Sequence, residues 1–216
     1  MFKWLPILLM IIFLFPVASN AEDDLLIQVV IDDTGSLQDG EDPENTSTAR
    51  NSAIGLLSHL SRTHGRGTRV IVISQHGGKN IWTGDSRKIT SPAQNGPIEK
   101  FLTDDWGGCS DLLRVPTILN ENIYLYPAKE HHFVFFSSLI HTGLPCGVED
   151  FSLDNLVPAQ FLGQVGSLIE ENNAKYSFYW VFDDPVSDAK SKLVAFARRL
   201  GVRGTIRTET ETRGGY

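Results

Sequence analysis

The chain has little cysteine and no cluster of basic residues. Two of its 216 residues are cysteine, and its formal net charge is −7. An acidic surface without a basic patch repels nucleic acid and anionic membranes, so neither is an expected partner. The sequence also lacks a Ser-His-Asp elbow, a phosphate-binding glycine loop and a zinc-type spacing of cysteine and histidine. No run after residue 17 is apolar enough to predict a membrane span.

The first residues have the order of a secretory signal peptide. Lys3 carries a single positive charge, residues 5–17 are all apolar, and the small residues ASNA precede an acidic segment. This order predicts a signal peptide over residues 1–21 and a periplasmic or secreted protein after its cleavage. An uncleaved anchor is the alternative, although the apolar run is shorter than the ~20 residues of a typical span.

The rest of the chain predicts one folded domain. With 41% hydrophobic and 21% charged residues, the composition is that of a globular protein. We expect the domain to cover residues 22–207, followed by a polar tail over residues 208–216. In an exported chain, an isolated pair such as Cys109 and Cys146 favours a disulfide, and two buried thiols are the alternative.

Buried apolar runs alternate with segments of helical spacing. The expected strands are residues 25–31, 69–74, 132–137 and 176–182, with a short edge strand over 79–83. The expected helices are residues 48–60 capped by 45–47, 98–102 opened by Pro97, 110–119 kinked or divided by Pro116, 157–169 and 189–200. This alternation predicts a three-layer α/β domain with a doubly wound, mostly parallel sheet.

The strongest site candidate follows the first strand, where such sheets bind their ligands. Asp32, Thr34 and Ser36 alternate in the sequence DDTGS, so a tight loop can direct one carboxylate and two hydroxyls at one point. Hard oxygen ligands of this kind suit Mg²⁺, Ca²⁺ or Mn²⁺. The alternative is a helix-capping turn rich in Asp, Thr and Ser.

The sequence VVIDDTGSL resembles the opening of a von Willebrand factor A (VWA) domain, whose metal-ion-dependent adhesion site begins with Asp-x-Ser/Thr-x-Ser. The resemblance continues in the strand RVIVIS and in the loop GGCSD, where Ser110, followed by Asp111, matches the threonine that the family supplies to the metal. It implies a doubly wound fold, a divalent ion and a protein partner whose acidic side chain completes the coordination. We therefore expect a binding protein for adhesion or an envelope assembly.

One position departs from the family pattern. A later strand of VWA domains usually ends in Thr-Asp-Gly, and here HFVFFSSLIHTG places Ser138 at the aspartate. The loss of an anionic ligand implies weaker binding of the ion, for which Asp33 or Asp111 could compensate. The resemblance also places Cys109 and Cys146 in neighbouring loops at one rim, which supports a disulfide between them.

An enzyme is the alternative function. IDDTGSL is also similar to the Asp-Lys-Thr-Gly-Thr loop of P-type ATPases in the haloacid dehalogenase superfamily. Asp32 would then be the nucleophile of a phosphatase or phosphotransferase, with Asp183 and Asp184 holding Mg²⁺. However, Thr34 stands where phosphatases of this type have a second aspartate, so we expect a binding protein that is not an enzyme.

Overall fold

Six strands form one sheet, and β1 lies inside it. The structure is a computed structural model that describes residues 23–33, 43–89, 92–103, 111–137, 139, 159–180, 187–201 and 204–207. Its strands are β1 (Asp23–Ile31), β2 (Thr68–Ser74), β3 (Lys79–Asp85), β4 (Ala128–Ser137), β5 (Lys175–Trp180) and β6 (Gly204–Arg207). The order across the sheet is β3-β2-β1-β4-β5-β6, and every neighbouring pair is parallel except β2 and β3. The expected mostly parallel sheet is confirmed.

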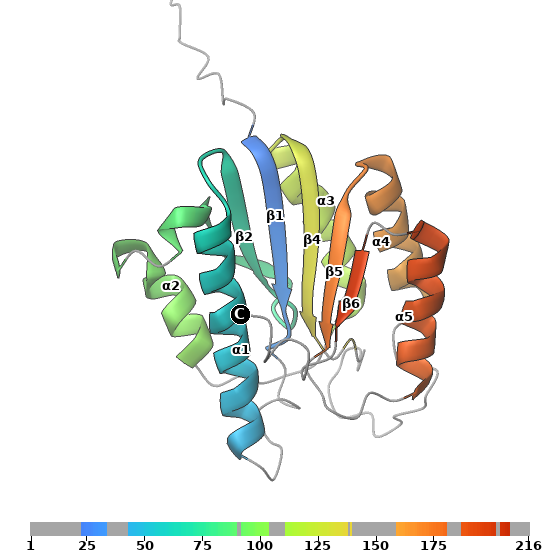
Figure 1. Cartoon of the computed structure of the whole chain (residues 1–216), viewed down its shortest axis with the longest axis horizontal. Helices are drawn as coiled ribbons and strands as arrows, with labels where there is room; N and C mark the ends of the chain where they lie inside the picture. The colour runs from blue at the N-terminus through green and yellow to red at the C-terminus, as the bar shows by residue number, and fades with distance from the viewer. Residues whose placement is uncertain are drawn as a thin grey trace, which may run out of the picture.

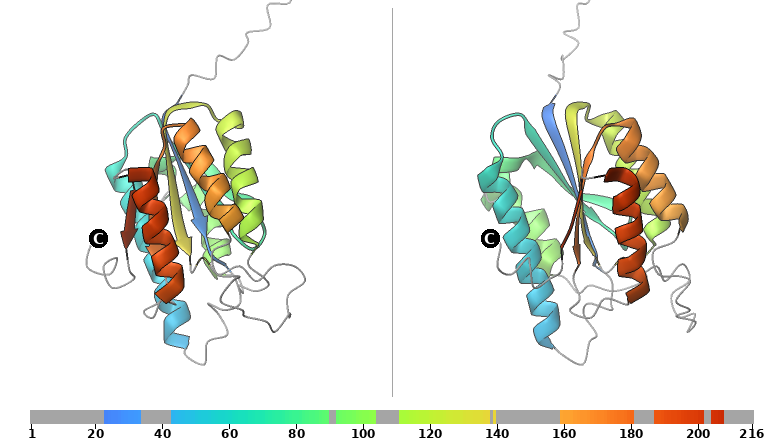
Figure 2. Two further views of the ribbon diagram at one scale, coloured as in Figure 1. Left: turned by 90° about the vertical axis from the view of Figure 1, so that its right-hand side faces the viewer. Right: turned by 45° about the vertical axis from the view of Figure 1, so that its right-hand side comes forward.

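Helices cover both faces of the sheet, which makes the three layers (Figures 1 and 2). The α-helices are α1 (Pro43–Thr63), α2 (Pro92–Thr103), α3 (Val115–Leu125), α4 (Ala159–Glu171) and α5 (Ser187–Leu200), and the 3₁₀ turns are η2 (Ser86–Lys88) and η3 (Leu112–Arg114). Helices α1 and α2 contribute to the core on one face, and α3, α4 and α5 to the core on the other. No helix among the described residues is long and apolar enough to cross a membrane.

Side chains of β1 alternate between these two cores. Leu26 and Val30 pack with α3 to α5, whereas Ile27, Val29 and Ile31 pack with α1 and α2. Each of the five is completely buried. A strand with apolar side chains on both faces must lie inside a covered sheet, which explains the unbroken apolar run in the sequence. The same alternation decides to which face the polar residues after β1 point.

Two helices begin earlier than the sequence predicts. Helix α1 begins at Pro43, so residues 45–47 lie within it instead of capping it, and α2 begins at Pro92 with Pro97 inside it. Proline suits the first position of a helix because its fixed φ is helical and no hydrogen bond is lost there. Pro116 acts as expected: it stands in the first turn of α3, and the segment is divided into η3 and α3.

Strand β6 was not predicted, because its four residues, GTIR, hold one aliphatic side chain. It pairs in parallel with β5, and Gly204 lies opposite Tyr176. A side chain at position 204 would overlap the Tyr176 ring, so the close approach of these two strands requires glycine here. Strand β4 is also longer than expected, because residues 128–130 pair with the start of β1.

Burial of His132 predicts an acid-sensitive fold. Burial, with smaller contributions from the charges of His64 and Lys175, lowers the pKa of His132 from 6.5 to about 4. The folded protein thus favours neutral imidazole, so its stability is complete above pH 6.5 and falls as the pH drops from 6.5 towards 4. By linkage, the free energy of unfolding should be about 2 kcal/mol lower at pH 5 than at pH 7.5 from this group. Urea unfolding of wild type and His132→Gln at both pH values measures it. Equal losses in the two proteins would contradict the assignment.

Candidate functional site

The carboxyl ends of β1, β2 and β4 meet at the lower edge of the sheet in Figure 1. This edge carries two buried aspartates in sequence, Asp32 at 0% exposure and Asp33 at 8%. They follow directly on Ile31, the last residue of β1. A parallel sheet places its ligand-binding residues at this edge, so these carboxyl groups mark the candidate site.

Asp32 is held by the end of β4. Its backbone N–H donates to the Phe136 carbonyl at 2.9 Å, and its Oδ2 accepts from Ser137 Oγ at 3.1 Å. Ser137 Oγ also lies 2.6 Å from Gln75 Oε1. A hydroxyl has one proton, so Ser137 donates to Asp32 or to Gln75 at any one moment. The Asp32 carboxylate can therefore turn to another partner without leaving the Ser137 proton unsatisfied.

Asp33 bonds to a different part of this edge, the end of β2 and the turn that follows it. Its Oδ2 accepts from Ser74 Oγ at 2.5 Å and its Oδ1 from the His76 backbone N–H at 2.8 Å. Ser74 Oγ in turn accepts from the Gly77 N–H at 2.8 Å. Both carboxylate oxygens thus hold the turn between β2 and β3, which also carries Gln75. We infer that Asp33 anchors this turn.

Burial raises the pKa of Asp33, while its bonds to Ser74 and His76 oppose this shift and the charge of Asp32 adds to it. Among the described residues, none of the groups that shift this pKa is positively charged. The charge of Asp32 thus disfavours a second negative charge on Asp33 at the end of β1. A cation bound near Asp32 would reduce their mutual repulsion.

Asp111 lies at the start of the helical segment that leads into α3. Its Oδ1 accepts from the Leu113 N–H at 3.2 Å and its backbone carbonyl from the Arg114 N–H at 3.3 Å, so it caps η3. This end of the segment is at the same edge of the sheet as Asp32, since α3 runs back against the direction of β4 (Figure 1). The other predicted site residues lie outside the described residues: Thr34, Ser36, Cys109, Ser110, Ser138, Cys146, Asp183 and Asp184.

The backbone conformation of Leu139 supports the alignment of residues 137–139 with the Thr-Asp-Gly pattern of VWA domains. Its φ is 57°, in the left-handed region that favours glycine, and it occupies the position of the glycine in that pattern. Its N–H donates to Ser137 Oγ at 2.8 Å, and its side chain is 1% exposed in the core with α3 and α4. Core packing thus holds a conformation that costs a non-glycine residue of order 1 kcal/mol.

The donor chemistry at this edge fits a hard divalent cation. Asp32 supplies a buried carboxylate, and Ser137 supplies a hydroxyl that can release it. Within the part of the chain that the structure describes, no three His, Cys, Asp or Glu side chains are grouped to hold a metal. Oxygen ligands with few carboxylates suit Mg²⁺ or Mn²⁺ better than a thiolate- or imidazole-binding ion. The remaining ligands would be the hydroxyls of Thr34, Ser36 and Ser110.

Sequence reasoning assigned no role to Ser74, Gln75 or Ser137 at this edge. The available signal was their position: each is a polar residue at the end of an otherwise apolar strand, in RVIVISQ and FVFFS. All three are at most 1% exposed. A buried polar residue must find a hydrogen-bonding partner, and at the carboxyl ends of adjacent parallel strands the partners are the neighbouring strand ends.

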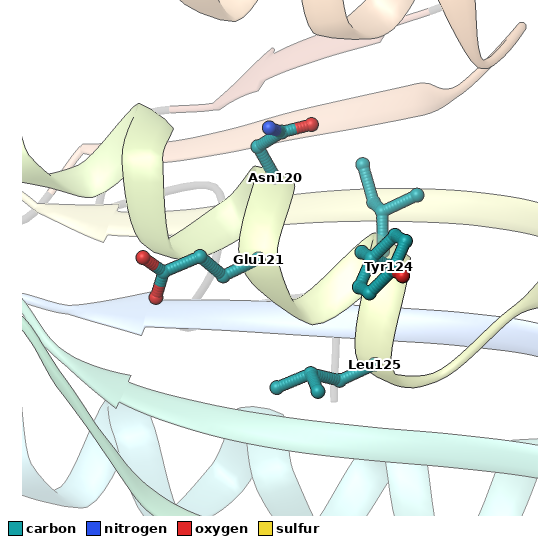
Figure 3. A pocket seen from close by; sticks show the side chains of 5 residues that line it. Asn120, Glu121, Tyr124 and Leu125 are labelled. Atoms are coloured by element: carbon teal, nitrogen blue, oxygen red, sulfur yellow. The ribbon is translucent and has the colours of Figure 1, made fainter.

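A second surface feature lies at the other end of α3. An open hollow of about 460 Å³ is lined by Asn120, Glu121, Ile123, Tyr124 and Leu125. Figure 3 shows Asn120, Glu121, Tyr124 and Leu125 on this one helix. Tyr124 is 87% and Leu125 59% exposed. The hollow therefore belongs to the helix surface and is separate from the edge that carries Asp32.

Comparison with solved structures identifies the fold. The structure is similar to the VWA domain of SpRpn10, with a TM-score of 0.53, 8% identity, and coverage of 86% of this chain and 87% of that one. It is similar to manganese-loaded TRAP protein from Plasmodium vivax, with a TM-score of 0.52, 11% identity, and coverage of 89% and 71%. For the N-terminal domains of the type V pili tip protein Mfa5 from Porphyromonas gingivalis, the TM-score is 0.59, with 7% identity and coverage of 90% and 48%.

These similarities, with the strand order and the site at the end of β1, show that the chain has a VWA-like α/β fold. The chain spans 46% of proximal thread matrix protein 1 from the mussel byssus and 59% of the PilB minor pilin from Streptococcus sanguinis, so it corresponds to about half of these similar structures. No protein-family model matches the sequence, and a search of curated proteins finds no match.

Ser137→Ala should lower the free energy of unfolding by about 1–3 kcal/mol, because it removes a hydroxyl that bonds the buried Asp32 carboxylate and accepts from Leu139. Ser167→Ala is the control. That hydroxyl donates to the Gly163 carbonyl on the exposed side of α4, so its loss should change stability by less than about 0.5 kcal/mol. Urea unfolding compares the two. Equal effects would mean that Ser137 does not support Asp32.

Proposed function

We propose that this chain is an exported VWA-type domain that binds a protein partner through a divalent cation near Asp32, in adhesion or in an assembly of the cell envelope. The observation that carries the proposal is the completely buried Asp32 carboxylate at the carboxyl end of β1, in a VWA-like fold. Burying an ionised carboxylate is costly unless bonds or a cation compensate it, so its presence at a ligand-binding edge favours a function.

Several residues of the chain would have separate roles at this cation site. Asp32 and the hydroxyls of Thr34, Ser36 and Ser110 would hold the cation, and Asp111 would add negative charge from the start of η3. Ser137 orients the Asp32 carboxylate through a hydrogen bond. When Asp32 turns to the cation, the Ser137 hydroxyl would donate its hydrogen bond to Gln75 Oε1 instead. The cation, when bound, would offer a positive centre to an acidic side chain of the partner.

An extracellular setting agrees with the similar structures and with the sequence. Among these structures are a pilus tip protein and a minor pilin. The predicted signal peptide over residues 1–21 would deliver the chain to the periplasm or beyond. There a disulfide between Cys109 and Cys146 could form and would restrain the loops on either side of the site. The partner would be another envelope or extracellular protein.

Divalent ions should stabilise the protein, and loss of the Asp32 charge should abolish the effect. At Mn²⁺ concentrations of about 100 times Kd, binding to the folded state adds about 2.7 kcal/mol, which raises Tm by about 5–10 °C in a domain of this size. Asp32→Asn and Asp32→Ala should show no such rise in a thermal melt with MnCl₂ or MgCl₂.

Asp85→Ala is the matched control, because Asp85 bonds Arg87 at the other end of the sheet. It should keep the full response to the metal. The absence of a rise in the wild type would show that the site does not bind these ions. Hydrolysis of a generic phosphate ester, lost in Asp32→Asn, would instead indicate the phosphatase alternative.

Ser138→Asp should strengthen the binding of Mg²⁺ or Mn²⁺ by about tenfold, because it restores the anionic ligand that the family pattern has at this position. Ser138→Asn, which is similar in size but neutral, should leave the affinity unchanged. Isothermal titration of the three proteins measures both effects. An affinity that does not rise in Ser138→Asp would show that position 138 does not face the ion.

A further inference from the structure

Gln28 is a polar residue in the middle of the apolar strand β1. It is completely buried, and by alternation it points to the same face as Leu26 and Val30, the face that α3 covers. Its neighbours Ile27 and Val29 pack on the opposite face. A buried amide in such a strand costs stability unless its donors and acceptor are hydrogen-bonded, so the Gln28 side chain needs partners inside the protein.

These bonds connect β1 to α3. Gln28 Nε2 donates to the Leu119 carbonyl at 3.0 Å, and Asn122 Nδ2 donates to Gln28 Oε1 at 2.9 Å. Asn122 is 1% exposed, so both ends of this connection are inside the protein. Asn122 also exchanges two hydrogen bonds with Asn80 on β3, at 2.7 and 3.0 Å. One network, buried at Gln28 and Asn122 and exposed at Asn80, therefore holds α3 against the central strand and the edge strand.

Hydrogen bonds fix the position of α3 along β1 more sharply than apolar contacts can. Leu112, Val115 and Leu119 pack against the same core as Leu26 and Val30. Such contacts are non-directional and tolerate small shifts of a helix along its axis. In contrast, a shift of one residue would separate Gln28 from both of its partners and leave buried amides unsatisfied.

The two connected elements both lead to the edge that carries Asp32. Gln28 lies four positions before Asp32, which corresponds to a rise of about 13 Å along the strand direction. Along the chain, α3 and then the 3₁₀ turn η3 lead from Asn122 back to Asp111, over about 18 Å. The tie between Gln28 and Asn122 thus sets the height of Asp111 relative to Asp32.

We propose that Gln28 and Asn122 are positioning residues for the divalent-cation site, and this inference rests on the function proposed above. They fix the register between the element that carries Asp32 and the element that begins at Asp111, without touching the ion. Replacing both amides with apolar groups of similar size removes the hydrogen bonds that fix this register. It leaves few buried polar groups unsatisfied, so stability should change little.

The test uses Gln28→Met/Asn122→Leu in the full chain, with Mn²⁺ as the probe. We expect Mn²⁺ affinity, measured by isothermal titration, to fall about tenfold, as for other residues that orient a metal site from outside its ligand set. Tm without metal should remain within about 5 °C of the wild type. Asn80→Ala is the matched control, because it removes the bonds to β3 but keeps the tie between β1 and α3. Its Mn²⁺ affinity should be unchanged.

An affinity within twofold of the wild type in the double variant would overturn the inference while leaving the proposed site intact. No binding of Mn²⁺ by the wild type would overturn both proposals. If the double variant does not fold, the single variant Gln28→Met takes its place with the same expected loss and the same criterion. A loss of Tm without a loss of affinity would make the network merely structural, which also contradicts the inference.

Discussion

The bond between Ser137 Oγ and the buried Asp32 carboxylate connects the ends of the two central strands of the sheet. A carboxylate removed from water is tolerated only where donors or a cation replace its hydration. Around this bond, the turn after β2 contributes Gln75, and Leu139, two residues after the end of β4, is buried in the core in a left-handed conformation. The geometry of this edge therefore depends on keeping Asp32 in one place, where it can meet a ligand.

Two adjacent aspartates have separate tasks because successive residues near the end of a strand point to opposite faces. Asp32 contacts β4 on the face of α3, whereas Asp33 contacts β2 and the turn that follows it. We propose that the first binds the cation, whereas the second holds a neighbouring turn in place. Gln28 lies on the same face as Asp32, four residues earlier, and bonds to α3 in the middle of the sheet.

Much of the fold was predictable because its strands are continuous apolar runs, which follow from burial on both faces. The family pattern likewise directed attention to Asp32, which the structure places at the predicted edge. Other features depend on contacts that a linear pattern does not contain. Strand β6 has one aliphatic residue and forms because Gly204 fits against Tyr176, and the starts of α1 and α2 are set by Pro43 and Pro92. The roles of Ser137 and Gln75 could not be predicted, because they depend on how the ends of β1, β2 and β4 lie relative to one another in space.

Paramagnetic broadening by Mn²⁺ tests, residue by residue, whether a divalent cation binds beside Asp32. In ¹⁵N-resolved NMR spectra of the protein, substoichiometric Mn²⁺ should broaden the amide resonances of Asp32, Asp33, Asp111 and Leu139. Those of Tyr124 and Leu125, at the far end of α3, should remain sharp. Broadening centred on the far end of α3, or no selective broadening at the carboxyl end of β1, would contradict the account.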